Sequence, residues 1–323
     1  MSPRRPVDVP ALVEAARAGQ PRAVARLISL GENAHPVLRE VMAALMPHAG
    51  KAHIVGITGA PGVGKSTSTN ALVTALRQRG KRVGVLAIDP SSPFSGGAIL
   101  GDRIRMSEHS LDSEVYIRSM ASRGHLGGVS WATPQAIRVL DAAGCDVIIV
   151  ETVGVGQSEV DIAGLADTSL VLLAPGMGDG IQAAKAGILE IGDIFVVNKA
   201  DREGAEATVR DLRHMISLGD RTEPGLWRPP VLKTVAADHD GVDEVLDAVE
   251  KHLEWLRSHN ILGQRRLRRA ADEIEAIAMQ TLRQRMGDLR SGHRLADLAQ
   301  YVLDGRVDPY AAADDLVASL VEP

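Results

Sequence analysis

Short apolar runs dominate the middle of this chain and predict its fold. Several of them are apolar at successive positions, as strands buried on both faces of a sheet are. Six runs have this character: 53–58 (HIVGIT), 82–89 (RVGVLAID), 146–151 (DVIIVE), 169–175 (SLVLLAP), 193–199 (DIFVVNK) and 230–236 (PVLKTVA). Segments with helical spacing, such as 66–79 and 133–143, separate most of these runs. The alternation predicts an α/β fold built on a doubly wound, mostly parallel sheet.

Both ends of the chain carry helical patterns instead. Apolar positions recur at helical spacing between residues 8 and 50, where Pro21 and Pro36 are predicted to lie in the first turns of new helices. Residues 242–256 read as the closing helix of the sheet domain, and beyond about residue 258 no strand pattern remains. We therefore expect three parts: an N-terminal helical extension at 1–50, the α/β domain at 51–257 and a C-terminal helical arm at 258–323.

The C-terminal arm is too small to bury its own apolar residues. One stripe runs between Arg-rich faces and consists of Leu267, Ala271, Ile274, Ala278 and Leu282. It must pack on the main domain or on another chain. Four arginines precede or flank it, namely Arg265, Arg266, Arg268 and Arg269. They could contact an acidic partner, but a solvated helix face is the favoured interpretation.

Composition narrows the class of protein. The 323 residues carry a formal net charge of −5, and aromatic residues make up only 2%, which argues against nucleic acid as a partner. Cys145 is the single cysteine, so no intrachain disulfide can form. No secretory signal and no apolar run of about 18 residues is present, so we expect no membrane partner and a cytoplasmic location.

The segment GAPGVGKST fits the phosphate-binding pattern G-x-x-x-x-G-K-[ST] between a predicted strand and a predicted helix. Its glycines let backbone N–H groups turn toward a phosphate, and the helix N-terminus adds partial positive charge. Lys65 is expected to reach the outer phosphates, and Ser66 to ligate Mg²⁺. The nucleotide-binding loop comprises Gly59, Ala60, Pro61, Gly62, Val63, Gly64, Lys65, Ser66 and Thr67. It predicts a nucleoside triphosphate site.

The tetrapeptide NKAD at 198–201 follows a predicted buried strand and indicates which base is bound. Asp201 can accept hydrogen bonds from N1–H and the exocyclic amine of guanine, whereas adenine presents neither donor on that edge. Asn198 can tie this segment to the phosphate loop, and the stem of Lys199 can cover the base. A second loop at 235–241, through Ala236 and the backbone N–H of Ala237, gives a weaker signal. Guanine nucleotides, GTP and GDP, are the expected ligands.

Carboxylates at strand ends and in one loop are candidates for the metal and for nucleotide-dependent switching. Four residues are candidate Mg²⁺ ligands: Ser66, Asp89, Asp102 and Glu151. Mg²⁺ takes few protein oxygens together with phosphate and water, so they are not all expected to bind at once. Gly154 can bring its backbone N–H to the γ-phosphate, and Gln157 could position the attacking water. The segment 175–187 (PGMGDGIQAAKAG) reads either as a further switch or as a helix-capping loop.

Five motifs together resemble the MeaB/ArgK-type GTPases, which include the human methylmalonic aciduria type A protein. They are GAPGVGKST, AIDPSSPFSGGAILGDRIRM, RSMASRGHLGG, ETVGVGQSE and NKAD. The resemblance covers about residues 5–320 and implies a P-loop GTPase domain at 51–257 and a homodimer formed by the C-terminal arm. It also implies a partner, the adenosylcobalamin-dependent methylmalonyl-CoA mutase, whose cofactor loading the GTPase gates and which it protects. A separate adenosyltransferase could join the complex.

The resemblance also assigns a third switch to residues 176–187. Here Gly180-Ile181 and Ala183-Ala184 depart from the family pattern, while Gln182 and Lys185 remain. Lys185 is the candidate charge stabiliser when the partner is docked. Lys65, Lys185 and Gln157 are thus the expected catalytic residues.

Three other functions compete with this interpretation. A kinase linked to an arginine/ornithine transport system would favour ATP, against the NKAD segment. A nickel-delivery GTPase typically carries His-rich tracts or paired cysteines, whereas the ten histidines here are scattered. A structural dimer merely stabilised by nucleotide would have no need of switch-like loops.

Overall fold

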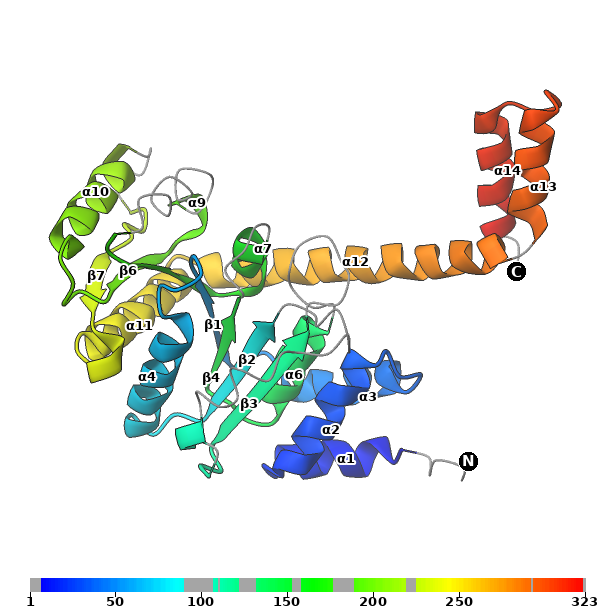
Figure 1. Cartoon of the computed structure of the whole chain (residues 1–323). Coiled ribbons are helices and arrows are strands. Elements are labelled where there is room, and N and C mark those ends of the chain that lie inside the picture. The colour runs from blue at the N-terminus through cyan, green and yellow to red at the C-terminus, as the bar shows by residue number, and fades with distance from the viewer. Residues whose placement is uncertain are drawn as a thin grey trace. The chain divides into compact units, whose positions relative to one another are not determined.

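The computed structural model describes residues 7–89, 107–109, 111–121, 132–152, 158–176, 189–218, 225–291 and 293–321. Its centre is one seven-stranded sheet in which every strand pairing is parallel, in the order β3-β2-β4-β1-β5-β6-β7 (Figure 1). The strands are β1 (His53–Thr58), β2 (Val83–Asp89), β3 (Val115–Ala121), β4 (Val147–Glu151), β5 (Thr168–Leu173), β6 (Ile194–Asn198) and β7 (Val231–Thr234). The predicted α/β class and parallel sheet are confirmed.

Alternation along β1 sends side chains to two different cores. Val55 and Ile57 face a core built with α4 (Lys65–Gln78) and α11 (Val242–Ser258). Ile54 faces the opposite core, and Gly56 lies on that side too, where an added Cβ would be 2.5 Å from Ile162 Cγ1 of α7 (Ser158–Leu165). Helices therefore cover both faces of the sheet, as successive apolar residues in its strands require.

The N-terminal helices belong to the second of these cores. They are α1 (Val9–Arg17), α2 (Pro21–Glu32) and α3 (Leu38–Leu45), and they pack with α6 (Thr133–Ala142) and with β2 to β4. Further along the same sheet, α10 (Ala205–Leu218) packs on β5, β6 and β7 through a separate apolar cluster. Pro21 begins α2, as predicted. The prediction for Pro36 is wrong: it lies in a turn closed by the hydrogen bond from Leu38 N to His35 O, and α3 begins only at Leu38.

Strand β3 was not among the predicted strands. It lies at the edge of the sheet, where its pattern is broken by the polar residues Arg118 and Ser119. Arg118 donates to Ser29 Oγ at 3.0 Å and pairs with Glu32, so α2 supplies the partners for this charge. A contact between segments some ninety residues apart leaves no local signal in the sequence.

The chain divides into two compact units, Met1–Arg265 and Arg266–Pro323. The second contains most of α12 (Ile261–Ser291), with α13 (His293–Leu303) and α14 (Pro309–Val321), which pack on each other. Several of its large apolar side chains are open to solvent: Leu267 is 73% exposed and Ile274 68%. Among the described residues, no helix combines the length and apolarity needed to cross a membrane.

A buried polar chain lies at the amino ends of the central strands. Thr168 Oγ1 is 2.8 Å from both His53 Nε2 and His252 Nδ1. His252 Nε2 lies 3.3 Å from Asp193 Oδ1, and Asp193 in turn receives hydrogen bonds from Arg265 and from the backbone N–H of Ser169. This network of hydrogen bonds joins β1, β5 and α11 to the start of α12. For Arg265 the predicted solvated helix face is wrong, because its guanidinium is paired with Asp193.

We predict that His252 makes the stability of this unit depend on pH. Burial lowers the pKa of His252 from 6.5 to about 4. As the pH falls, His252 is therefore protonated near pH 6.5 in the unfolded chain but only near pH 4 in the folded protein. The contribution of neutral His252 to the free energy of unfolding is complete above pH 6.5. Roughly 3 kcal/mol of this free energy is lost as the pH falls from 6.5 to 4. Urea unfolding measured from pH 7.5 to 4.5 gives the slope of the free energy of unfolding against pH. This slope should be smaller in His252→Gln than in the wild-type protein.

The exposed His259, seven residues after His252 and directly after the last residue of α11, offers the matched control. His259→Gln should keep the wild-type pH slope. Equal slopes in all three proteins would show that His252 is not the group responsible.

Candidate nucleotide-binding site

The phosphate loop connects the carboxyl end of β1 to the first turn of α4. α4 begins at Lys65, so Ser66 and Thr67 also lie in its first turn. The turn uses left-handed backbone at Gly62 (φ +83°) and Gly64 (φ +96°), a region that disfavours residues with a Cβ. An added Cβ would lie 2.3 Å from Leu172 O at Gly59 and 2.5 Å from Asn198 Nδ2 at Gly64. Space as well as backbone conformation thus requires glycine at both pattern positions.

Lys65 is held at the mouth of this loop. The residue is 8% exposed, and Nζ donates to the carbonyls of Gly59 at 2.7 Å and Ala60 at 3.1 Å. A buried ammonium is costly to desolvate and gains most from a nearby anion. The loop therefore presents a fixed positive charge beside a helix N-terminus, which is the arrangement that binds phosphate.

Two hydroxyls from α4 hold the carboxylate at the end of β4. Ser66 Oγ donates to Glu151 Oε1 at 2.7 Å, and Thr69 Oγ1 donates to Glu151 Oε2 at 2.8 Å. All three side chains are buried. A hydroxyl and a carboxylate of this kind are ligands that Mg²⁺ accepts, directly or through water, so the residues fit the ion. The described residues contain no cluster of three or more acidic, His or Cys side chains that could hold a metal without phosphate.

Asn198 joins three segments at the carboxyl edge of the sheet. Its Nδ2 donates to Val63 O of the phosphate loop at 2.8 Å. Its Oδ1 accepts from Thr234 Oγ1 and from the backbone N–H of Ala236, both at 3.1 Å. Asn198 is 2% exposed, so each of these bonds is shielded from water. The NKAD segment, the phosphate loop and the loop after β7 are thereby fixed relative to one another.

The remaining NKAD residues lie beside these bonds. Lys199 takes a left-handed conformation (φ +58°) and donates from Nζ to Gly62 O at 2.6 Å, so its stem runs between the two loops. Asp201 is exposed, in the turn that follows. Ala237 lies in the short helix η4 (Ala236–Asp238) after β7. The residues of the phosphate loop and of the NKAD segment are thus brought to one edge of the sheet.

Several predicted residues cannot be placed. Asp102, Gly154, Gln157 and Lys185 lie outside the described residues. Asp89 ends β2, but only its backbone is described. Their assigned roles in metal binding, switching and catalysis stay predictions.

Three threonines of the site were not predicted. Thr69 holds Glu151, Thr234 donates to Asn198, and Thr152 Oγ1 lies 3.2 Å from Thr58 Oγ1 between β4 and β1. A signal for Thr69 does exist: it is three residues after Ser66, and such spacing places both hydroxyls on one face of the helix. No comparable spacing marks Thr152 or Thr234.

Comparison with known proteins identifies the family of the chain. The model of the MeaB family, described as methylmalonyl Co-A mutase-associated GTPase, matches residues 24–290. The chain belongs to the MeaB family. It is a P-loop GTPase of that family.

Relatives resemble this MeaB-family chain over most of its length. A protein of Pyrococcus abyssi with a provisional GTPase name is 47% identical over 96% of both chains. GTPase ArgK of Escherichia coli is 39% identical over 72% of both chains, and the methylmalonic aciduria type A homolog of Caenorhabditis elegans is 35% identical over 81% of this chain and 67% of its own. The crystal structure of a protein named LAO/AO transport system kinase matches with a TM-score of 0.71 at 25% identity, over 97% of this chain and 98% of its own.

We predict that Thr69 stabilises the folded protein through Glu151. Thr69→Val keeps the shape of the side chain but removes the donor to the buried Oε2. The free energy of unfolding should fall by about 1–3 kcal/mol, as measured by urea denaturation. Thr69→Ser, which retains the hydroxyl, should recover most of that loss; an equal loss in both variants would instead indicate a packing effect.

Proposed function

We propose that this chain binds and hydrolyses GTP with Mg²⁺ and acts as a chaperone for an adenosylcobalamin-dependent methylmalonyl-CoA mutase. In this role it gates cofactor loading and protects the mutase. The observation that carries the nucleotide part is the hydrogen bonding of Asn198, which connects the NKAD segment to the phosphate loop. Base recognition and phosphate binding are then properties of one connected site.

The residues divide the work of phosphoryl transfer. Lys65 and the backbone N–H groups of the loop neutralise charge as the γ-phosphoryl group leaves. Ser66 and Glu151 would hold Mg²⁺, and Thr69 keeps the Glu151 carboxylate directed at the first turn of α4. When bound, Mg²⁺ would supply further neutralisation of the phosphate charge. Gln157, Lys185, Asp89 and Asp102 would complete the site when the partner is docked.

The partner is inferred from the family. The description of the MeaB family names methylmalonyl-CoA mutase, and one relative is named for methylmalonic aciduria. The exposed apolar residues of α12, including Leu267 and Ile274, favour a homodimer through the C-terminal unit. Both assignments are part of this proposal.

Hydrolysis measured with and without the client tests the proposal. GTP and ATP turnover in Mg²⁺ should be compared alone and with a purified adenosylcobalamin-dependent methylmalonyl-CoA mutase. Marked stimulation of GTP hydrolysis, and none of ATP hydrolysis, is expected. GTP turnover indifferent to the mutase would remove the client while leaving the GTPase. A preference for ATP would instead favour the transport-linked kinase, the activity for which one structurally similar protein is named.

We predict that Asp201→Asn exchanges the base that is recognised. An amide can donate where the carboxylate only accepts, so it no longer matches the two donors of guanine but does match the C2 carbonyl of xanthine. GTP affinity should fall at least a hundredfold and XTP affinity should rise, as measured by calorimetry. The exposed Asp211 of α10 provides the control, since Asp211→Asn should leave both affinities unchanged. Unaltered GTP binding by Asp201→Asn would refute the base assignment.

A further inference from the structure

A second cavity lies at the opposite end of the sheet from the phosphate loop. It has a volume of about 600 Å³ and opens between α4 and α11, over the amino-terminal halves of β1 and β4. His53 and Val55 of β1 and Val147 and Ile149 of β4 line it from the sheet. None of the residues assigned to nucleotide binding is among its lining residues.

The inner wall of this cavity is apolar. Leu72 and Leu76 come from α4, Leu246 and Val249 from α11, and Leu170 from β5. His53 is the polar side chain at this depth, and its Nε2 lies 2.8 Å from Thr168 Oγ1. A volume between about 300 and 1,000 Å³ that combines an apolar wall with a few polar groups is typical of small-molecule sites.

The rim of the cavity is charged, and most of its acids are already bonded within the protein. Asp141 accepts hydrogen bonds from the backbone N–H groups of Gly50, Lys51 and Ala52. Asp146 accepts from the backbone N–H of Arg82, and Glu250 pairs with Arg79 at 3.2 Å. These carboxylates therefore have few free acceptor positions with which to bind a cationic ligand.

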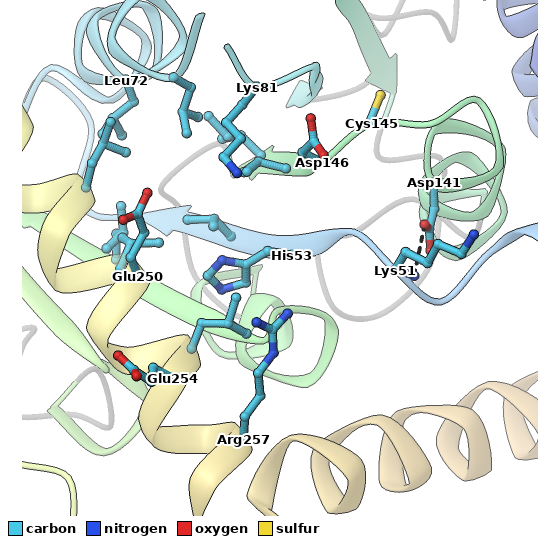
Figure 2. A pocket seen from close by; sticks show the side chains of 18 of the residues that line it. Lys51, His53, Leu72, Lys81, Asp141, Cys145, Asp146, Glu250, Glu254 and Arg257 are labelled. Atoms are coloured by element: carbon cyan, nitrogen blue, oxygen red, sulfur yellow. Dashed lines mark hydrogen bonds between the residues drawn. The ribbon is translucent and has the colours of Figure 1, made fainter. Parts of the chain in front are cut away.

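Two of the cations that line the cavity, besides Lys51, are differently placed. Lys81 and Arg257 form no ion pair with any carboxylate that the structure describes. Figure 2 shows both side chains pointing toward His53 from opposite sides of the cavity, while Glu254 points away. The nearby C-terminal turns of α4 and α11 carry only partial negative charge, less than the full charges of these two side chains.

We propose that this cavity binds a small amphipathic anion, with an apolar chain against Leu72, Leu76 and Val249 and a carboxylate at Lys81 and Arg257. Charge complementarity selects the anionic head, because two cations point into the cavity and Asp141, Asp146 and Glu250 are already bonded within the protein. The apolar wall selects the chain. A ligand polar throughout would leave the wall without contacts, and a cationic amphiphile would meet two like charges.

Calorimetric titration of the full-length protein with decanoate, below its micellar concentration, tests this site. One decanoate should bind per chain, and affinity should rise about three- to fourfold for each methylene added from octanoate to dodecanoate. Decyltrimethylammonium, which has the same chain and the opposite charge, should bind at least tenfold more weakly than decanoate. Equal affinity for the two amphiphiles would overturn the proposal.

Variants on the rim locate the head group without disturbing the core. Lys81→Glu and Arg257→Glu should each weaken decanoate at least tenfold, and Lys251→Glu, on the exposed side of α11, should change it less than twofold. GTP affinity should be unchanged in all three. Val249→Phe, which fills the cavity, should also weaken decanoate at least tenfold.

Two results would overturn the assignment. Decanoate binding unchanged in both Lys81→Glu and Arg257→Glu would show that it binds elsewhere or nonspecifically. If Arg257→Glu altered the sedimentation of the protein but not its decanoate affinity, a second chain would be the occupant instead. Because Lys81 and Arg257 are not buried, their substitution tests the site even if Val249→Phe fails to fold.

Discussion

The amide of one buried residue, Asn198, constrains the whole nucleotide site. It contacts the phosphate loop on one side and the loop after β7 on the other, and it leaves no room for a Cβ at Gly64. A buried amide has both donor and acceptor atoms, so it can satisfy carbonyl and N–H groups from different loops at once. The loops on which base and phosphate recognition depend are thereby set in one geometry before any ligand arrives.

The two ends of the sheet serve different physical purposes. At the carboxyl end the strands are followed by glycine-rich and polar loops, and helix N-termini and hydroxyl groups lie close together there. Ligands of parallel α/β sheets typically bind at this end. At the amino end, Thr168 joins His53 to His252, and Asp193 receives Arg265 from the start of α12. That buried network of hydrogen bonds joins strands and helices at this end of the sheet. Lys81 and Arg257 lie at the rim of the neighbouring cavity.

Local patterns predicted most of the fold. Buried strands such as β1 and β4 appear as apolar runs because both of their faces are covered, and the phosphate loop is recognisable because glycine is the residue that fits its turn. Edge strand β3 was missed because its charge, Arg118, is neutralised by Glu32 on a distant helix. The hydroxyls of Thr152 and Thr234 were missed for the same reason, since their partners are distant in sequence. The sequence pattern predicts a solvated Arg265 because its partner Asp193 is 72 residues away in the chain.

The most direct test of the account is the GDP affinity of Asn198→Ala, measured by calorimetry in Mg²⁺ with ADP in parallel. If one buried amide fixes the base and phosphate loops together, GDP affinity should fall at least tenfold, and the preference over ADP should shrink with it. GDP affinity equal to that of the wild-type protein would show that the loops hold their positions without Asn198, and would contradict the account.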